Sequence, residues 1–473
     1  MERHEMVNDI HTRLNPTRVG RVEAPATLDG LRAAVASASA SGDPISIAGG
    51  CHAMGGQQFV TDGVVIDTRR LDRVLGFDAS AGIVEVEAGI QWPALIDRLV
   101  AMQQGNERQW AIAQKQTGAD RLTIGGSLSA NVHGRGLAMK PFIADVESFT
   151  ILDAGGSLRT CSRSENRELF RLAIGGYGLF GIVCAVRLRL RPRHKLRRVV
   201  EMTTIEKAMA LFQQRIDAGF QYGDFQFDIN QQADGFLSRG VLACYQPVDP
   251  ATPLRAAQRE LSEADWLNLF ALAHTDKQRA FDLYTSHYRS TDGQIYWSDI
   301  GQLSYYPDNY HVALDRQLGS AHPASEVITE IYVARSELAA FMGEVAEDFR
   351  GDGTDLIYGT VRLIEPDDES FLAWAKQPYA CIVFNLHVVH TPADQVRAGA
   401  AFRKLIDRGL AHGGSYFLTY HRHATRLQVE ACYPQMPEFL RLKRAYDPNE
   451  AFQSDWYRHY RSMFADRLRE PSR

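Results

Sequence analysis

The sequence has few of the features that mark disulfide-rich, membrane or nucleic-acid-binding proteins. Only six of its 473 residues are cysteines, scattered without a CxxC pair, so we expect reduced thiols in cores and loops. No run approaches the roughly 20 apolar residues of a membrane-spanning helix, and the polar N-terminus has no apolar signal core. The formal net charge of −5 gives no excess of basic residues for nucleic acid. These absences predict a cytoplasmic protein with no membrane span and no nucleic-acid partner.

What is present is a chain long enough for two or three domain-sized cores, without internal repeats or low-complexity segments. Helical patterns fall at residues 27–40, 92–102, from about 125, 165–174, 205–218, within 256–291, 335–349 and 392–408. Strand patterns fall at residues 45–47, 63–67, 82–88, 144–152, 158–160, 222–230, 326–333, 356–364 and 381–390. Gly409 is placed to cap the last of these helices. Mixed elements of this kind predict an α+β fold.

The most informative stretch is residues 45–67, ISIAGGCHAMGGQQFVTDGVVID. Two short strands flank a loop in which four glycines surround His52. Closely spaced glycines let successive backbone N–H groups point at one place, and such a nest holds an anion, usually a phosphate. The stretch therefore predicts a pyrophosphate cradle with a reactive imidazole on it. The alternative is an ordinary glycine-rich turn with a surface histidine.

Two further stretches strengthen the first interpretation: residues 123–136, TIGGSLSANVHGRG, and residues 175–183, GGYGLFGIV. In their order and spacing, the three stretches resemble the flavin domain of the vanillyl-alcohol oxidase family, which has the PCMH-type FAD-binding fold. The resemblance implies FAD as cofactor. In many members the histidine matching His52 is bonded to the 8α carbon of the flavin, so we expect covalent FAD. Family members commonly read GRGHS where this chain has GGCHA.

The resemblance also implies an architecture: an FAD-binding domain of two α+β subdomains and an antiparallel-sheet cap, or substrate, domain. We place the FAD-binding domain at residues 1–195, the cap domain at 196–410, and a segment returning to the first domain at 411–473. The basic run at 187–198 is expected to be a solvated junction between the first two domains.

By position, the resemblance implies a set of flavin contacts. The cofactor-binding residues are Ala48, Gly49, Gly50, Cys51, His52, Ala53, Met54, Gly55, Thr117, Gly118, Thr123, Gly125, Gly126, Ala130, Asn131, His133, Gly134, Ile182 and Phe417. The small residues of the helix from about 125 could instead serve tight helix packing, and Asn131 and His133 could be satisfied structural groups.

The third stretch also contains a literal GxGxxG at Gly176, Gly178 and Gly181. A dinucleotide site of that kind needs a strand before the motif and a helix after it. Here a helical pattern precedes and a strand pattern follows, so we reject an NAD site.

Catalysis by a flavin requires polar groups that hold the donor oxygen and share its proton. Alternation places Asn385 and His387 on one face of the strand 381–390, and Arg362 on the preceding strand. Polyol and aldonolactone oxidases offer a Glu-x-Arg pair from a similar strand, and here the pair reads Thr360 and Arg362. The catalytic candidates are Arg362, Asn385, His387 and Tyr420.

The C-terminal tail resembles that of the decaprenyl-phosphoryl ribose oxidase branch. The positions that match its flavin contact are Phe417 and Tyr420, and the substrate lysine of that branch is absent. His421 and His423 would need a third ligand to bind a metal, and we see none in the sequence. We therefore expect no metal.

These features predict an FAD-linked oxidase or dehydrogenase that oxidises an alcohol of a carbohydrate-like or other polar small molecule. Its partners would be that substrate and O2 or another electron acceptor. An alternative is an oxidase of phenolic or secondary-metabolite substrates, with Tyr332, Trp374 and Tyr420 stacking on the ring. A non-catalytic flavin-binding module is the alternative from a different class.

Overall fold

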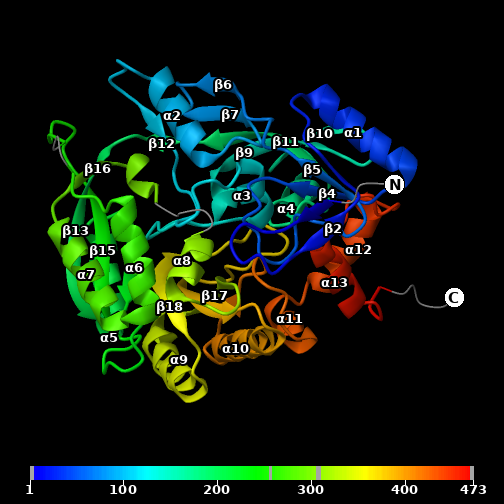
Figure 1. Ribbon diagram of the computed structural model, residues 1–473. Coiled ribbons are helices and arrows are strands. Elements are labelled where there is room, and N and C mark those ends of the chain that lie inside the picture. Colours follow the sequence, from blue (N-terminus) through cyan, green and yellow to red (C-terminus); the bar gives the residue numbers. More distant parts are fainter. Residues whose placement is uncertain (1–4, 255–257, 305–309, 469–473) are drawn as a thin grey trace.

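The N-terminal part of the chain forms two larger sheets that lie side by side in the upper half of Figure 1, and two small sheets that pair β1 with β2 and β8 with β12. The computed structural model describes residues 5–254, 258–304 and 310–468. A three-stranded parallel sheet has the order β3-β5-β4, and a five-stranded antiparallel sheet has the order β10-β9-β11-β7-β6. The elements of this part are β1 (Glu5–Val7), β2 (Thr17–Val19), β3 (Arg21–Glu23), α1 (Leu28–Ser41), β4 (Ile45–Ala48), β5 (Val64–Asp67), β6 (Val74–Asp78), β7 (Ile83–Glu87), α2 (Trp92–Met102), β8 (Trp110–Ala111), α3 (Ile124–Ala130), η1 (Phe142–Asp145), β9 (Val146–Leu152), β10 (Leu158–Ser162), α4 (Arg167–Ala173), β11 (Ile182–Arg189) and β12 (Arg191–Pro192).

The middle of the chain forms one antiparallel sheet of eight strands, in the order β16-β13-β15-β14-β18-β19-β17-β20. Helices α5, α9 and α10 cover one face, where Phe384 packs against Phe341 and Phe349. The elements are β13 (Lys195–Thr204), α5 (Ile205–Asp217), β14 (Tyr222–Phe227), β15 (Arg239–Pro247), α6 (Glu263–Thr275), α7 (Lys277–Ser290), β16 (Ile295–Trp297), η2 (Ile300–Gln302), α8 (Tyr310–Leu318), β17 (Ala324–Ala334), η3 (Arg335–Glu337), α9 (Leu338–Asp352), β18 (Leu356–Ile364), β19 (Tyr379–Val389) and α10 (Pro392–Ala411). The start of the stretch predicted as helical at 256–291 lies outside the described residues.

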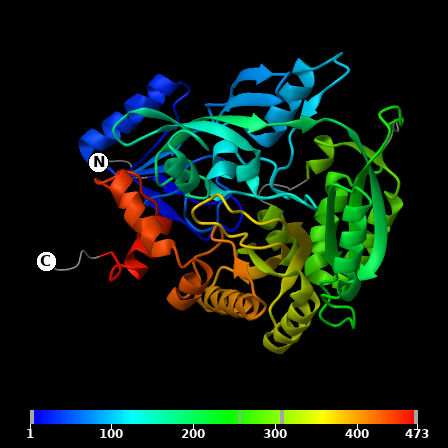
Figure 2. The same cartoon turned by 180° about the vertical axis from the view of Figure 1, so that it is seen from behind.

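The C-terminal segment joins the two parts. It adds β20 to the edge of the eight-stranded sheet and then runs back to the N-terminal part, where Ile45 N donates to Ala451 O at 2.7 Å and Asp455 N to Phe59 O at 2.8 Å. Both views show α12 and α13 beside the N-terminal strands and far from α5 to α7 (Figures 1 and 2). The elements of this segment are β20 (Ser415–Tyr416), α11 (Arg426–Cys432), α12 (Met436–Tyr446) and α13 (Asp455–Met463).

Two predictions about local structure are wrong. Helix α10 continues past Gly409 to Ala411 and is capped by His412. Gly409 is needed for packing, because a Cβ there would lie 2.7 Å from Cγ2 of Ile331 in the sheet. The basic run is only partly solvated, because Arg198 is half-buried against Tyr245 and Arg193 pairs with Asp299 at 2.8 Å.

The inverted context of the GxGxxG is confirmed: helix α4 precedes it and strand β11 follows it. Within the described residues, no helix combines the length and the apolar character that crossing a bilayer requires.

Candidate functional site

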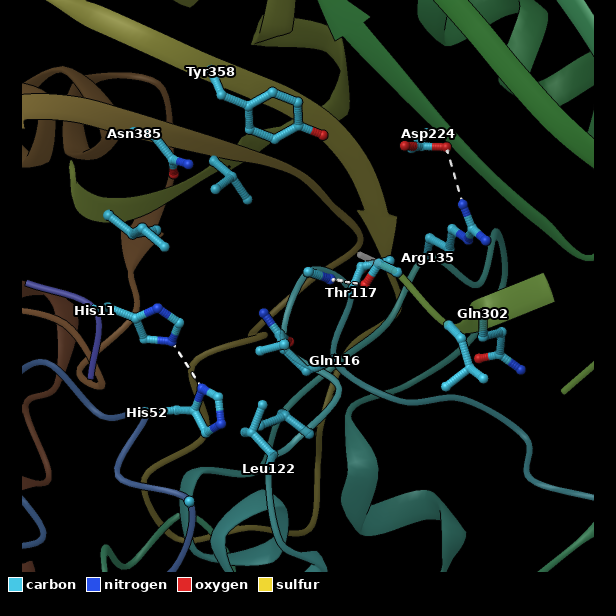
Figure 3. A pocket seen from close by; sticks show the side chains of 18 of the residues that line it. His11, His52, Gln116, Thr117, Leu122, Arg135, Asp224, Gln302, Tyr358 and Asn385 are labelled. Carbon is cyan, nitrogen blue, oxygen red and sulfur yellow. Dashed lines mark hydrogen bonds and ion pairs between the residues drawn. The ribbon is translucent and has the colours of Figure 1, made fainter. Parts of the chain in front are cut away.

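A cavity of about 840 Å³ lies between the N-terminal part and the face of the eight-stranded sheet opposite α5, α9 and α10, and residues of α6 and α7 also line it (Figure 3). One wall comes from the glycine-rich loop after β4, the connection before α3, and α3 itself. The opposite wall comes from β14, β17, β18 and β19, and the tail supplies Phe417 and Tyr420. The predicted residues that line it are Gly49, Gly50, Cys51, His52, Ala53, Met54, Thr117, Gly118, Thr123, Gly125, Gly126, Ala130, Arg362, Asn385, Phe417 and Tyr420.

The glycine wall is built by close approach of two loops. A Cβ on Gly49 would lie 2.3 Å from Oγ1 of Thr123, and one on Gly50 would lie 2.4 Å from the carbonyl oxygen of Arg121. The Thr123 hydroxyl in turn accepts from Gly126 N at 3.1 Å and caps α3. Only glycine allows this packing, and it leaves backbone rather than side chains at the wall.

The same wall carries buried polar atoms that have no hydrogen-bond partner among the described residues. Among the described residues, Oε1 of Gln116 and Oγ1 of Thr117 are buried at the cavity without a hydrogen-bond partner. Buried polar groups are normally paired, so unpaired ones in a cavity wall indicate a missing ligand. A polar group such as the nucleotide part of FAD fits this wall.

His52 is held by a second histidine. Its Nδ1 lies 2.8 Å from Nε2 of His11, and its own Nε2 has no hydrogen-bond partner among the described residues. Burial and the neighbouring His11 lower the pKa of His52 well below its usual value. The imidazole is therefore neutral, and its Nε2 lies on the side of the ring away from His11, with the backbone of Arg121 nearby (Figure 3).

Cys51 does not share the position of His52. The loop is not extended there, since Cys51 has φ 57°, in the left-handed region. Its side chain packs with Val19, Ala48 and Phe59 beneath the loop, and burial raises the pKa of the thiol to about 11. The thiol is therefore protonated and a poor nucleophile.

On the sheet wall, the strand register gathers the polar side chains on one face. Asn385 on β19 lies opposite Ile328, and His387 lies opposite Glu326, both on β17. Because opposite residues share a face and the period is two, Asn385 and His387 lie on the same face, as predicted. Arg362 on β18 lies opposite Cys381 on that face.

Arg362 and Asn385 present free polar atoms to the cavity. Arg362 is 5% exposed, and its Nε and Nη1 have no hydrogen-bond partner among the described residues. The same holds for Oδ1 of Asn385. A buried guanidinium with unused donors is costly unless a ligand accepts from it.

Behind Arg362 lies a buried carboxylate, Glu330 of β17, that the sequence reading missed. Its side chain accepts from Tyr332 and Tyr420 hydroxyls at 3.0 Å each, from Cys381 Sγ at 2.9 Å, and contacts Nε2 of His133. Burial raises the pKa of Glu330, but His133, Arg362 and Cys381 outweigh it and bring the pKa to about 2. Glu330 thus places a carboxylate close to Arg362 from a different strand, but it is fully buried and does not line the cavity.

His387 does not line the cavity. Its Nδ1 lies 3.4 Å from Oε1 of Glu326, a second buried carboxylate that does line it. His274 and His311 also contact Glu326. Burial raises the pKa of Glu326, but the three histidines outweigh it and hold the pKa well below its usual range.

Six of the predicted flavin contacts lie outside the cavity lining: Ala48, Gly55, Asn131, His133, Gly134 and Ile182. Asn131 and His133 have structural partners, because Asn131 Nδ2 donates to Asp367 at 2.9 Å and His133 contacts Glu330. Ile182 is buried in the core beneath α1, while its neighbours Gly181 and Val183 line the cavity.

The structure also locates the predicted aromatic residues and the two histidines that were weighed as metal ligands. Tyr332 and Trp374 stack on each other at 4.7 Å and do not line the cavity, whereas Tyr420 does. The rings of His421 and His423 lie 5.6 Å apart, and no third ligand joins them in the described part of the chain.

Several cavity residues were missed by the sequence reading. Arg135 and Arg198 flank the ring of Tyr245 at the far end, near Asp224. Arg135 lies within the second glycine-rich stretch, next to the predicted contact Gly134, and Arg198 ends the basic run, so both were visible as charges. The sequence also offered a clue to Glu326 and Glu330. They interrupt an otherwise apolar strand, and buried glutamates are rare unless they are paired.

Comparison with known proteins identifies the N-terminal domain. Residues 20–162 match the FAD binding domain family. The chain therefore carries a PCMH-type FAD-binding domain, as the glycine-rich stretches predicted.

Individual relatives resemble different extents of the chain. It is 22% identical to decaprenylphosphoryl-beta-D-ribose oxidase of Mycolicibacterium smegmatis over 84% of each chain. It is 29% identical to cytokinin dehydrogenase 6 of Oryza sativa over 41% of this chain and 38% of that protein. It is 27% identical to L-gulonolactone oxidase of Bos taurus over 39% of this chain and 40% of that one. The chain thus spans about two fifths of the cytokinin dehydrogenase and the lactone oxidase.

Proposed function

We propose that the protein oxidises an alcohol group of a carbohydrate-like or other polar small molecule, with FAD as hydride acceptor and O2 as the final acceptor. The observation that carries the proposal is the set of unpaired polar atoms on Arg362 and Asn385, across the cavity from the glycine wall. Two relatives named as oxidases of a ribose derivative and of gulonolactone support this substrate class.

FAD, when bound, supplies the hydride acceptor, N5 of its ring system. The residues of the chain would handle the donor oxygen. Arg362 has unused N–H donors that can hold this oxygen and stabilise negative charge as its proton leaves. Asn385 Oδ1 can accept from a second hydroxyl of the substrate.

Tyr420 is suited to orient the substrate hydroxyl. Its own hydroxyl donates to Oε2 of Glu330 at 3.0 Å, so its oxygen can only accept from a group in the cavity. Glu330, with a pKa of about 2, fixes this direction and does not itself take the proton. The substrate C–H would leave as hydride and the O–H proton would leave to water, which balances a two-electron oxidation to a carbonyl.

We further propose a single covalent bond between His52 and the flavin. The support is the neutral imidazole with an unpartnered Nε2 on the loop, and the protonated, inward-packed thiol of Cys51.

A second candidate is the oxidation of phenolic or secondary-metabolite substrates, or a dehydrogenase reaction with another acceptor. The observation that favours aromatic substrates is a set of rings lining the cavity away from the glycine wall: Trp266, Phe270, Phe281, Tyr284, Tyr288 and Tyr296.

The test is anaerobic addition of a panel of sugars, aldonolactones and phenolic alcohols to the yellow protein. We expect a carbohydrate-like alcohol to bleach the flavin absorbance, and admission of O2 to restore it with release of hydrogen peroxide. Arg362→Ala should lower turnover by roughly 100-fold or more at normal flavin content, whereas Arg32→Ala, on the exposed face of α1, should not. Bleaching by phenols alone, or unchanged kinetics in Arg362→Ala, would contradict the proposal.

A further inference from the structure

Four polar side chains from three elements, α6, α8 and β19, meet around Glu326. Nε2 of His274 (α6) lies 3.1 Å from Oε1, and Nδ1 of His387 (β19) lies 3.4 Å from the same oxygen. The other oxygen, Oε2, lies 3.0 Å from Nδ1 of His311 and accepts from the hydroxyl of Tyr310 (α8). The side chains of His274 and Glu326 are 4% and 3% exposed, so this cluster is built into the interior.

In a neutral His274 the ring hydrogen is on Nδ1, away from Glu326. Its Nδ1 lies 2.8 Å from the carbonyl oxygen of Phe270, which can only accept, so Nδ1 must carry a hydrogen. A neutral His274 therefore has a bare Nε2, with a lone pair aimed at a carboxylate oxygen. Two lone pairs at 3.1 Å repel each other unless a positive charge lies between them. That charge is either a second proton on His274 or a metal ion.

The geometry of the cluster suits a metal. The ligand atoms of His274, Glu326 and His387 all lie within 4.8 Å of one another. Ligands bonded to a tetrahedral ion at roughly 2.0–2.1 Å are about 3.4 Å apart, close to the 3.1 and 3.4 Å seen here. The outer contacts also fit, because metal-bound histidines donate their other nitrogen to a carbonyl, and bound carboxylates are themselves hydrogen-bonded. Phe270 O serves His274 in this way, and His311 and Tyr310 serve Glu326.

We propose that His274, His387 and Glu326 bind a divalent transition-metal ion, with Zn²⁺ as the first candidate and Fe²⁺ or Mn²⁺ as others. Two histidines and one carboxylate are a common ligand set for these ions. Three protein ligands leave a position open, and Glu326 lines the cavity. The open position would therefore take an oxygen of the substrate, a role that rests on the proposed function. Binding of the ion does not rest on it.

The test measures bound metal and bound flavin separately on the full chain. Protein purified without a metal column is treated with a chelator, incubated with Zn²⁺, Mn²⁺ or, anaerobically, Fe²⁺, and desalted. Metal is counted by mass spectrometry, and flavin by absorbance. We expect about one ion per chain for at least one metal. His274→Ala and His387→Ala should lose it, and His311→Ala should weaken binding by roughly 10–100-fold, as expected for an outer contact.

His322→Ala is the matched control, since His322 is exposed and only four residues before Glu326. It should keep the ion. The inference is overturned if the wild-type chain binds no ion, a result that needs no variant to fold, or if His274→Ala and His387→Ala bind as much as His322→Ala. A chain that holds FAD and no ion refutes the metal alone. A chain that holds the ion and no FAD refutes the proposed function alone.

Discussion

The buried carboxylate Glu330 gives the sharpest stability prediction. Replacing it with glutamine in Glu330→Gln keeps the shape and removes the charge that His133, Arg362, Cys381 and Tyr420 surround. Glutamine approximates the protonated form of the acid. The free energy lost is therefore the difference between burying Glu330 charged and burying it neutral.

The magnitude follows from the pKa of about 2 in the folded chain against the usual 4.5. A difference of about 2.5 units corresponds to about 3 kcal/mol at neutral pH. Folding lowers the pKa of Glu330, so its charge stabilises the folded chain only where the carboxyl is ionised. This stabilisation is complete above about pH 5 and is lost as the pH falls from 4.5 toward 2. The gap between wild type and Glu330→Gln should therefore close as the solution is acidified.

The assay is urea unfolding followed by tryptophan fluorescence, in the same excess of FAD, at pH 7, 5 and 4. Glu347→Gln, at an exposed position on α9, is the control and should change the free energy of unfolding by less than about 0.5 kcal/mol. The reasoning is refuted if Glu330→Gln is as stable as wild type at pH 7. It is equally refuted if the gap stays constant down to pH 4, because then the charge of Glu330 is not what stabilises the fold.

The other predictions concern the tether and the packing of α10. Acid precipitation followed by mass spectrometry of the peptide spanning residues 45–69 should find flavin on His52 and none on Cys51, and His52→Ala should release all flavin. Flavin in the supernatant beside an unmodified wild-type peptide would exclude the bond and leave FAD binding intact. Gly409→Ala should destabilise the chain by up to about 2 kcal/mol. Overpacking against Ile331 costs about 1–3 kcal/mol, and the higher helix propensity of alanine offsets about 1 kcal/mol of that cost. Gly343→Ala, inside α9 with nothing near the added Cβ, should instead stabilise by roughly 0.5–1 kcal/mol; equal effects at both positions would show that the contact with Ile331 is not tight.

Part of the glycine wall followed from local sequence. The cap of α3 is local, because the Thr123 hydroxyl accepts from Gly126 N three positions on. Strand alternation likewise fixed that Asn385 and His387 share a face. These features could be predicted because they depend on neighbours only a few positions away.

Which polar groups face one another was decided by tertiary structure. Glu330 meets Arg362 and His133 because β17 and β18 both flank β19, an order that no single strand encodes. The same order turns His387 toward Glu326 and away from the cavity lining, and the fold brings His11 to His52 across 41 positions. Residue alternation specifies the face of a strand, whereas the neighbours on that face come from strand order and register, which depend on packing of the whole chain.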